Sequence, residues 1–175
     1  MKMIRNLIAL SLPLLLLGIF STVNSGCGVY RFSEAGKLPD TIRTVKVNFI
    51  ENRAQYVNPQ LSPRLTDKLR QKIVGQTKLS QTNNDNADWV ITGFVKEYAF
   101  STSAISGQQA SNNRLTVTVH ITKSDNKANL TDDYDVSRSF EFKGNRTFQQ
   151  AETDLADEMI RTLTDEIFNK LFSDW

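Results

Sequence analysis

The most constraining feature of the chain is a strict alternation of side chains over residues 114–123 (RLTVTVHITK). Apolar residues occupy every second position, and polar residues fill the positions between them. Successive side chains of a strand point to opposite faces, so this segment predicts a strand with one buried and one solvated face. The buried side carries Leu115, Val117, Val119 and Ile121, and the solvated side carries Arg114, Thr116, Thr118, His120 and Thr122. Such a sheet needs a covering layer on its apolar face.

Three further segments predict strands of the same sheet. Residues 41–50 alternate, and we expect Val45, Val47 and Phe49 on one side. Residues 89–98 are more apolar, and Gly93 within them indicates a bulge or a close backbone approach. A fourth strand carries Tyr134, Val136, Phe140 and Phe142 on one side. Arg138 falls in that apolar register, so its side chain must extend to solvent or pair with an acid.

Two segments with apolar residues at helical spacing supply the covering layer. The first starts at the helix-start signals Asn58-Pro59 and Ser62-Pro63 and ends at Gly75. Its apolar stripe consists of Leu61, Leu65, Leu69 and Ile73. The second starts at Thr147, which with Gln150 fits a helix capping box. Its stripe consists of Ala151, Leu155, Met159, Leu163, Ile167 and Leu171, and it runs nearly to the C-terminus.

The resulting order, β-α-β-β-β-α, predicts a single α+β domain over residues 41–175. The first two strands and the helix between them form a right-handed parallel crossover, and the last three strands form an antiparallel meander. We therefore expect a mixed four-stranded sheet with two helices packed on one face. Residues 100–113 are rich in Ser, Gly, Gln and Asn, which predicts a long surface loop.

The N-terminal segment predicts export from the cytoplasm. Lys2 and Arg5 precede an apolar run that is too short to span a bilayer comfortably, and small residues follow it. This pattern is typical of a cleaved signal peptide over residues 1–26. Residues 27–40 then form a tether between the new N-terminus and the domain.

The cysteine that begins this tether resembles the bacterial lipoprotein processing box. In that class the cysteine sulfur receives a diacylglycerol, and the new amino group is usually acylated. Acylated Cys27 would hold the protein on a membrane, since each buried methylene contributes about 0.8 kcal/mol. Gly28 follows it, and by resemblance to a known sorting rule this favours the outer membrane. The alternative is a leader cut elsewhere, with Cys27 left as a free thiol.

Composition excludes most thiol and metal chemistry. Cys27 and His120 are the only cysteine and histidine, so neither an intrachain disulfide nor a clustered zinc site is possible. Phosphate-binding loops and hydrolase motifs do not occur in the sequence. Asp132, Asp133 and Asp135 could act as acid, base or metal ligands, but we interpret the first two as a turn before a strand. We expect a non-enzymatic protein without a cofactor or a metal, with His120 on the solvent face.

Charge is balanced over the chain but unevenly distributed. The 21 basic residues include Lys2 and Arg5 of the leader, so the mature chain carries as many bases as its 19 acids. General binding to nucleic acid or another polyanion is therefore not expected. Basic residues concentrate on the first helix, at Arg64, Lys68, Arg70, Lys72 and Lys78, and around the third and fourth strands. Acids concentrate in the final helix.

Four segments together resemble the LptE family of lipopolysaccharide-assembly lipoproteins, in a divergent form found outside the enteric bacteria. They are residues 27–32 (CGVYRF), 57–62 (VNPQLS), 87–95 (ADWVITGFV) and 113–119 (NRLTVTV), in this order. The resemblance implies a four-stranded mixed sheet packed by two helices. It also implies a subunit without enzymatic activity that sits inside the outer-membrane barrel LptD, supports its folding and helps to deliver lipopolysaccharide to the cell surface.

Lipopolysaccharide contacts in this family are basic, so bases held near the third and fourth strands are candidates. Lipid A phosphates need fixed ammonium or guanidinium donors. The candidate residues are Arg114, Lys123, Lys127 and Arg138. An alternative function is that of an accessory periplasmic lipoprotein of another envelope transport complex, which would bind its partner protein through the 100–113 loop.

Overall fold

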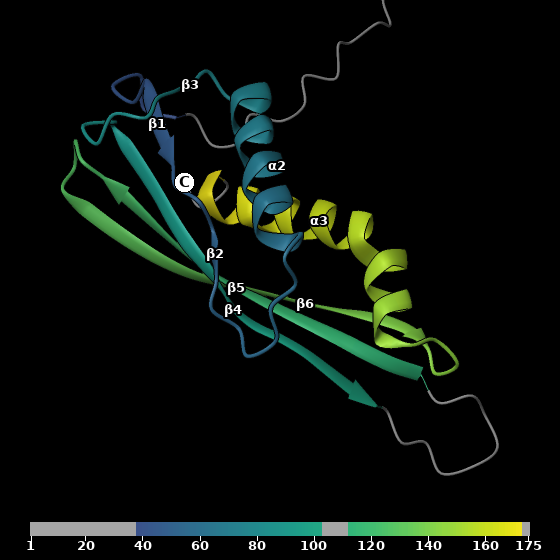
Figure 1. The fold of residues 1–175 in the computed structure, drawn as a ribbon. Helices are drawn as coiled ribbons and strands as arrows, with labels where there is room; N and C mark the ends of the chain where they lie inside the picture. Colours follow the sequence, from purple (N-terminus) through teal and green to yellow (C-terminus); the bar gives the residue numbers. More distant parts are fainter. Residues whose placement is uncertain (1–37, 103–111, 173–175) are drawn as a thin grey trace, which may run out of the picture. The chain divides into compact units, whose positions relative to one another are not determined.

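The computed structural model describes residues 38–102 and 112–172, and a mixed sheet forms the frame of this part of the chain (Figure 1). Its strands are β1 (Thr44–Val47), β2 (Glu51–Asn52), β3 (Ser80–Gln81), β4 (Trp89–Thr102), β5 (Asn112–Asp125) and β6 (Leu130–Lys143). The sheet order is β3-β1-β4-β5-β6, and β2 pairs with β4 beside β1. β1 lies parallel to β4, and β4, β5 and β6 form an antiparallel meander. The predicted α+β class, crossover and meander are confirmed, with two additional strands of two residues each. Asp132 and Asp133, expected in the turn before the last strand, lie within β6 and pair with Lys123 and Thr122 of β5.

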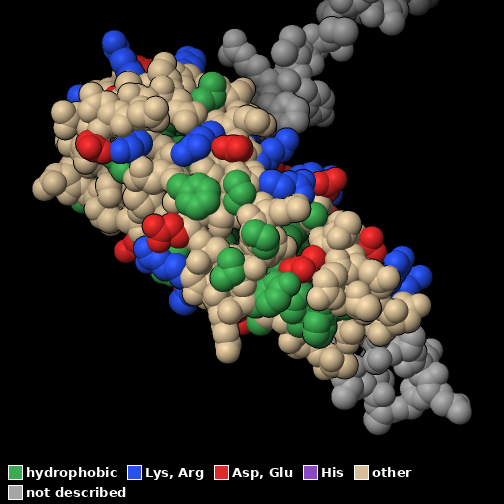
Figure 2. Space-filling view, viewed as in Figure 1, with side chains coloured by type: hydrophobic (Ala, Val, Ile, Leu, Met, Phe, Trp, Pro, Cys, Tyr) green, Lys and Arg blue, Asp and Glu red, His purple; other side chains and the backbone are tan. Residues whose placement is uncertain are grey.

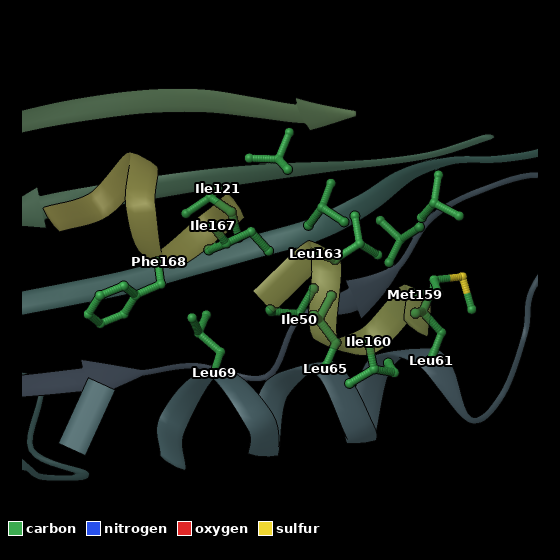
Figure 3. Close-up of a cluster of buried hydrophobic side chains, with 14 of the residues drawn as sticks. Ile50, Leu61, Leu65, Leu69, Ile121, Met159, Ile160, Leu163, Ile167 and Phe168 are labelled. Atoms are coloured by element: carbon green, nitrogen blue, oxygen red, sulfur yellow. The ribbon is translucent and has the colours of Figure 1, made fainter. Parts of the chain in front are cut away.

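Two helices cover one face of this sheet. They are α2 (Leu61–Gln76) and α3 (Phe148–Phe172). The predicted stripe of α2 is buried throughout, and that of α3 is buried except for half-exposed Leu155. Figure 3 shows how the two stripes meet: Leu61, Leu65 and Leu69 of α2 face Met159, Leu163 and Ile167 of α3. No helix among the described residues is both long and apolar enough to cross a membrane.

The predicted start of the final helix is confirmed. The Gln150 N–H donates to Thr147 Oγ1 at 3.3 Å, and the Thr147 N–H donates to Gln150 Oε1 at 3.0 Å. These two reciprocal bonds are the capping box that the sequence indicated. The first helix ends one residue beyond the predicted Gly75, where the Thr77 N–H still donates to the Ile73 carbonyl.

The first strand differs from its prediction. It ends at Val47, and Phe49 is 52% exposed instead of lying on the buried side with Val45. Val47 pairs with Ile91 and Glu51 pairs with Phe94, so the β1–β2 segment contains one residue more than the stretch of β4 beside it. An extra residue reverses the alternation of faces, because the side-chain period of a strand is two.

The sequence indicated either a bulge or a close backbone approach at Gly93, and the structure shows a close approach. A Cβ atom there would lie 2.6 Å from the His120 carbonyl oxygen and 2.6 Å from Ile121 Cδ1. The bulge of β4 lies further along, where the pairing with β5 shifts between Val95 and Glu97. Strands β4 and β5 also extend into the expected 100–113 loop, of which residues 103–111 lie outside the described part of the chain.

Candidate functional site

Arg114 lies near the start of β5, on the sheet face that points away from the helices. It is exposed, and its Nη2 lies 3.2 Å from Glu141 Oε1 on β6. A surface pair of this kind is weak, because water screens both charges. The guanidinium therefore remains available to an anion that competes with Glu141.

Lys123 lies at the other end of β5 and on the opposite face. It was expected as an accessible base, but it follows Ile121 on the face that the helices cover, and its side chain is buried to 7% exposure. Its Nζ lies 3.2 Å from Asp132 Oδ2 and 5.0 Å from the centre of the Trp89 ring. A buried cation with a carboxylate and an aromatic partner contributes to the packing of the sheet end.

Lys127 occupies the turn between β5 and β6, and its Nζ lies 3.3 Å from Asp88 Oδ1. The other oxygen of Asp88 accepts hydrogen bonds from the backbone N–H groups of Arg43 and Thr44, both at 2.9 Å, and from the Thr44 hydroxyl at 3.0 Å. These bonds, led by the one from the Arg43 backbone, lower the pKa of Asp88 to about 2. Asp88 thereby joins the start of β1 to the start of β4.

Arg138 lies in the apolar register of β6, as the sequence indicated. Its charge on this face is compensated by an acidic partner. Its guanidinium forms an ion pair with Glu166 of α3, while the side chain remains partly exposed. The pair links the edge strand to the final helix.

The four candidate bases do not form one cluster. Arg114 and Lys123 are separated along β5 by about 30 Å at the usual rise of a strand. Arg138 pairs opposite Val117 and shares the helix-covered face, whereas Arg114 lies on the other face. Each of the four has an acidic partner. Sequence spacing could not show this, because the partners are distant in the chain.

The solvated face of the sheet carries a polar network centred on His120. Its Nδ1 lies 2.7 Å from Asp135 Oδ1, and Lys96 Nζ lies 2.9 Å from the other oxygen of the same carboxylate. Hydrogen bonds from these two side chains, Lys96 first, lower the pKa of Asp135. The predicted position of His120 on this face is confirmed. No group of three His, Cys, Asp or Glu side chains that could hold a metal occurs among residues 38–102 and 112–172.

The same face is less open than predicted at its centre. Thr118 is 8% exposed, because its hydroxyl bonds to Glu97 Oε2 at 3.1 Å and to Ser137 Oγ at 2.9 Å. Thr116 forms a similar pair with Ser139 at 2.9 Å. The hydroxyl groups of Thr116 and Thr118 therefore form hydrogen bonds with neighbouring strands instead of with water alone.

A second polar cluster, missed in the sequence, lies at the start of α3. Glu152 accepts hydrogen bonds from Tyr98 at 2.9 Å, Tyr56 at 3.1 Å and Asn58 at 3.1 Å. Burial is the main cause that raises the pKa of Tyr98. The rings of Tyr56 and Tyr98 stack at 5.5 Å. Only the folded chain brings these residues together, so no local pattern could have identified them.

These features define a small α+β domain with polar side-chain clusters on its surface. Residues 42–171 match the model of the LptE family, described as lipopolysaccharide-assembly, and because this match covers most of the chain, the protein belongs to that family. The resemblance inferred from the sequence motifs is confirmed. Membership supports a role in lipopolysaccharide assembly, in a family of accessory lipoproteins that are not enzymes.

Two solved structures with TM-scores above 0.5 share the fold. A protein from Helicobacter pylori, described as a homologue of neuraminyllactose-binding hemagglutinin, matches with a TM-score of 0.53 at 7% identity, over 78% of this chain and 84% of its own. The protein CT253 from Chlamydia trachomatis matches with a TM-score of 0.51 at 12% identity, over 76% and 98%. A minor lipoprotein from Acinetobacter baumannii gives 0.48 at 16% identity, over 77% and 93%. No curated protein matches the chain in sequence.

Proposed function

We propose that this protein is an outer-membrane lipoprotein that plugs the LptD β-barrel, supports its folding and assists the delivery of lipopolysaccharide to the cell surface. The observation that carries the proposal is the family match over residues 42–171. The protein acts by binding and not by catalysis. Its polar, hydrogen-bonded sheet face suits contact with a polar protein wall.

The anchor is the acylated Cys27 that the leader predicts. Intact mass spectrometry of the mature protein, purified from membranes, should give the mass of a chain that begins at Cys27 and carries acyl groups. Cys27→Ser should leave the leader uncut or release a soluble form. A mature chain that begins elsewhere and has a free thiol would contradict the lipid anchor and its outer-membrane location.

The barrel partnership is tested by purification from detergent-solubilised outer membranes. A tagged copy of the protein should bring down one large β-barrel, and depletion of the protein should reduce the amount of correctly assembled barrel and of surface lipopolysaccharide. If another envelope complex co-purifies and surface lipopolysaccharide is unchanged on depletion, the protein is the accessory lipoprotein of a different machine.

Direct contact with lipopolysaccharide is proposed for the candidates Arg114, Lys123, Lys127 and Arg138. Arg114 and Lys127 are tested together, because both side chains are exposed and neither is tied to a helix, whereas Lys123 is buried and Arg138 pairs with Glu166 of α3. Arg114→Gln with Lys127→Gln should weaken lipopolysaccharide binding while barrel co-purification persists. The matched control is Lys143→Gln, an exposed base on β6. Equal binding by the double variant and the parent at matched ionic strength would exclude these two contacts.

A further inference from the structure

A groove between α2 and α3 contains two basic side chains without an acidic partner. The groove has a volume of about 450 Å³, and its walls consist of Arg64, Asp67, Lys68 and Gln71 from α2 and Asp157, Ile160 and Arg161 from α3. Both acids have basic partners, because Asp67 pairs with Arg70 and Asp157 pairs with Arg64. It lies on the helical layer and is therefore separate from the candidate bases of β5 and β6. The barrel partnership proposed above does not depend on it.

Lys68 and Arg161 belong to the minority of described bases that form no ion pair with a described acid, and both line this groove. Figure 2 shows Lys and Arg side chains beside Asp and Glu side chains at several places, and most described bases form ion pairs. Arg64 follows this rule by pairing with Asp157 across the groove. Lys68 and Arg161 have no carboxylate within ion-pair distance among residues 38–102 and 112–172. Moreover, Arg64 and Lys68 are like charges four residues apart on one helix, an arrangement that costs stability.

The groove is held in shape by the packing of the two helices beneath it. Ile160 is 6% exposed, and in Figure 3 it lies beside Leu61 and Leu65 of α2. Further along the helices, Lys72 Nζ lies 2.8 Å from Asp165 Oδ1. Lys68 and Arg161 are thus carried by two helices whose spacing is fixed.

We propose that Lys68 and Arg161 bind the phosphate group of a phosphate monoester in this groove, with the Gln71 amide as a neutral donor. A phosphate monoester carries nearly two negative charges at neutral pH and accepts several hydrogen bonds, which matches two cations on opposite walls. The planar Arg161 guanidinium can contact two phosphate oxygens, and the Lys68 ammonium supplies a point charge. The phosphate can belong to a lipid headgroup or to a soluble sugar phosphate.

The test uses the full mature lipoprotein in an uncharged detergent, titrated with glucose 1-phosphate and followed by amide NMR. We expect saturable shifts over residues 64–71 and 157–161, and no such shifts with glucose. Lys68→Gln with Arg161→Gln should weaken binding by about tenfold or more, whereas Arg161→Lys, which keeps the charge and loses the bidentate contact, should weaken it less than the double variant does. The charge-matched control is Lys78→Gln with Lys143→Gln, two exposed bases outside the groove, and it should bind as the parent does.

The site is refuted if the parent shows no saturable shift, or if the control pair loses as much affinity as the groove pair. Competition identifies the source of the phosphate. If lipopolysaccharide displaces glucose 1-phosphate and its dephosphorylated form does not, the bound phosphate is that of lipid A. If neither form displaces glucose 1-phosphate, the ligand is a soluble phosphate monoester. Both results support the groove. A failure of barrel co-purification would overturn the proposed function and leave these titrations unaffected.

Discussion

Replacement of Asp88 by Asn tests how the start of the sheet is held. The Asp88 carboxylate accepts bonds from two backbone N–H groups and one hydroxyl, and it lies 3.3 Å from Lys127 Nζ. Its pKa in the folded protein is about 2, against an ordinary value of 3.8. This difference corresponds to at most about 2.5 kcal/mol of stability at neutral pH. Asn retains an acceptor oxygen and the side chain is near the surface, so we expect Asp88→Asn to cost about 1–2 kcal/mol.

The loss of stability in Asp88→Asn should depend on pH, and this dependence tests its cause. A carboxylate whose pKa is lowered on folding stabilises the protein above about pH 4, and this stabilisation is lost as the pH falls through about 2. Urea midpoints of the parent and Asp88→Asn should therefore differ at pH 7 and converge near pH 2. Asp40→Asn, at an exposed carboxylate before β1, should match the parent throughout. A difference that persists unchanged at low pH would refute the charge-based explanation, and equal midpoints at pH 7 would refute the role of Asp88.

Three further substitutions test the sheet itself. Gly93→Ala should destabilise the protein by about 1–3 kcal/mol in urea unfolding, because the new methyl group would meet the His120 carbonyl; an unchanged midpoint would show that β5 yields easily. Val117→Asp should cost several kcal/mol, since it buries an unpaired charge. Thr118→Asp should cost more than 1 kcal/mol despite its place on the solvated face, because it sets a second carboxylate beside Glu97; a neutral result would mean that this part of the face is hydrated.

The parts of the fold that sequence could predict are those encoded by local periodicity. The alternation around Val117 and the stripe from Leu61 to Ile73 each repeat often enough to identify an element and its buried face. The alternation around Val45 predicts the wrong side for Phe49, because the side depends on how many residues of β4 lie beside this segment. That number is a property of the strand pairing and not of the segment itself.

The candidate site was less predictable, because its chemistry depends on partners distant in the chain. Lys127 and Asp88 are 39 residues apart, and no local signal connects them. Thr118 occupies a solvated position by pattern, and its burial depends on Glu97 and Ser137 of the neighbouring strands. A side chain's type and register can therefore be read from sequence, whereas its availability to a ligand cannot.

The ion pair between Arg138 and Glu166 has a consequence for the protein before it meets any partner. β6 is the last strand in the sheet order, so no strand among residues 38–102 and 112–172 pairs with the outer side of its 14-residue backbone. Arg138 stands near the middle of this edge and on its apolar side, where a second sheet would have to bury it apart from Glu166. An inward-facing charge on an edge strand is a known defence against edge-to-edge aggregation. The same arginine that fastens the edge to α3 thus discourages self-association of the chain.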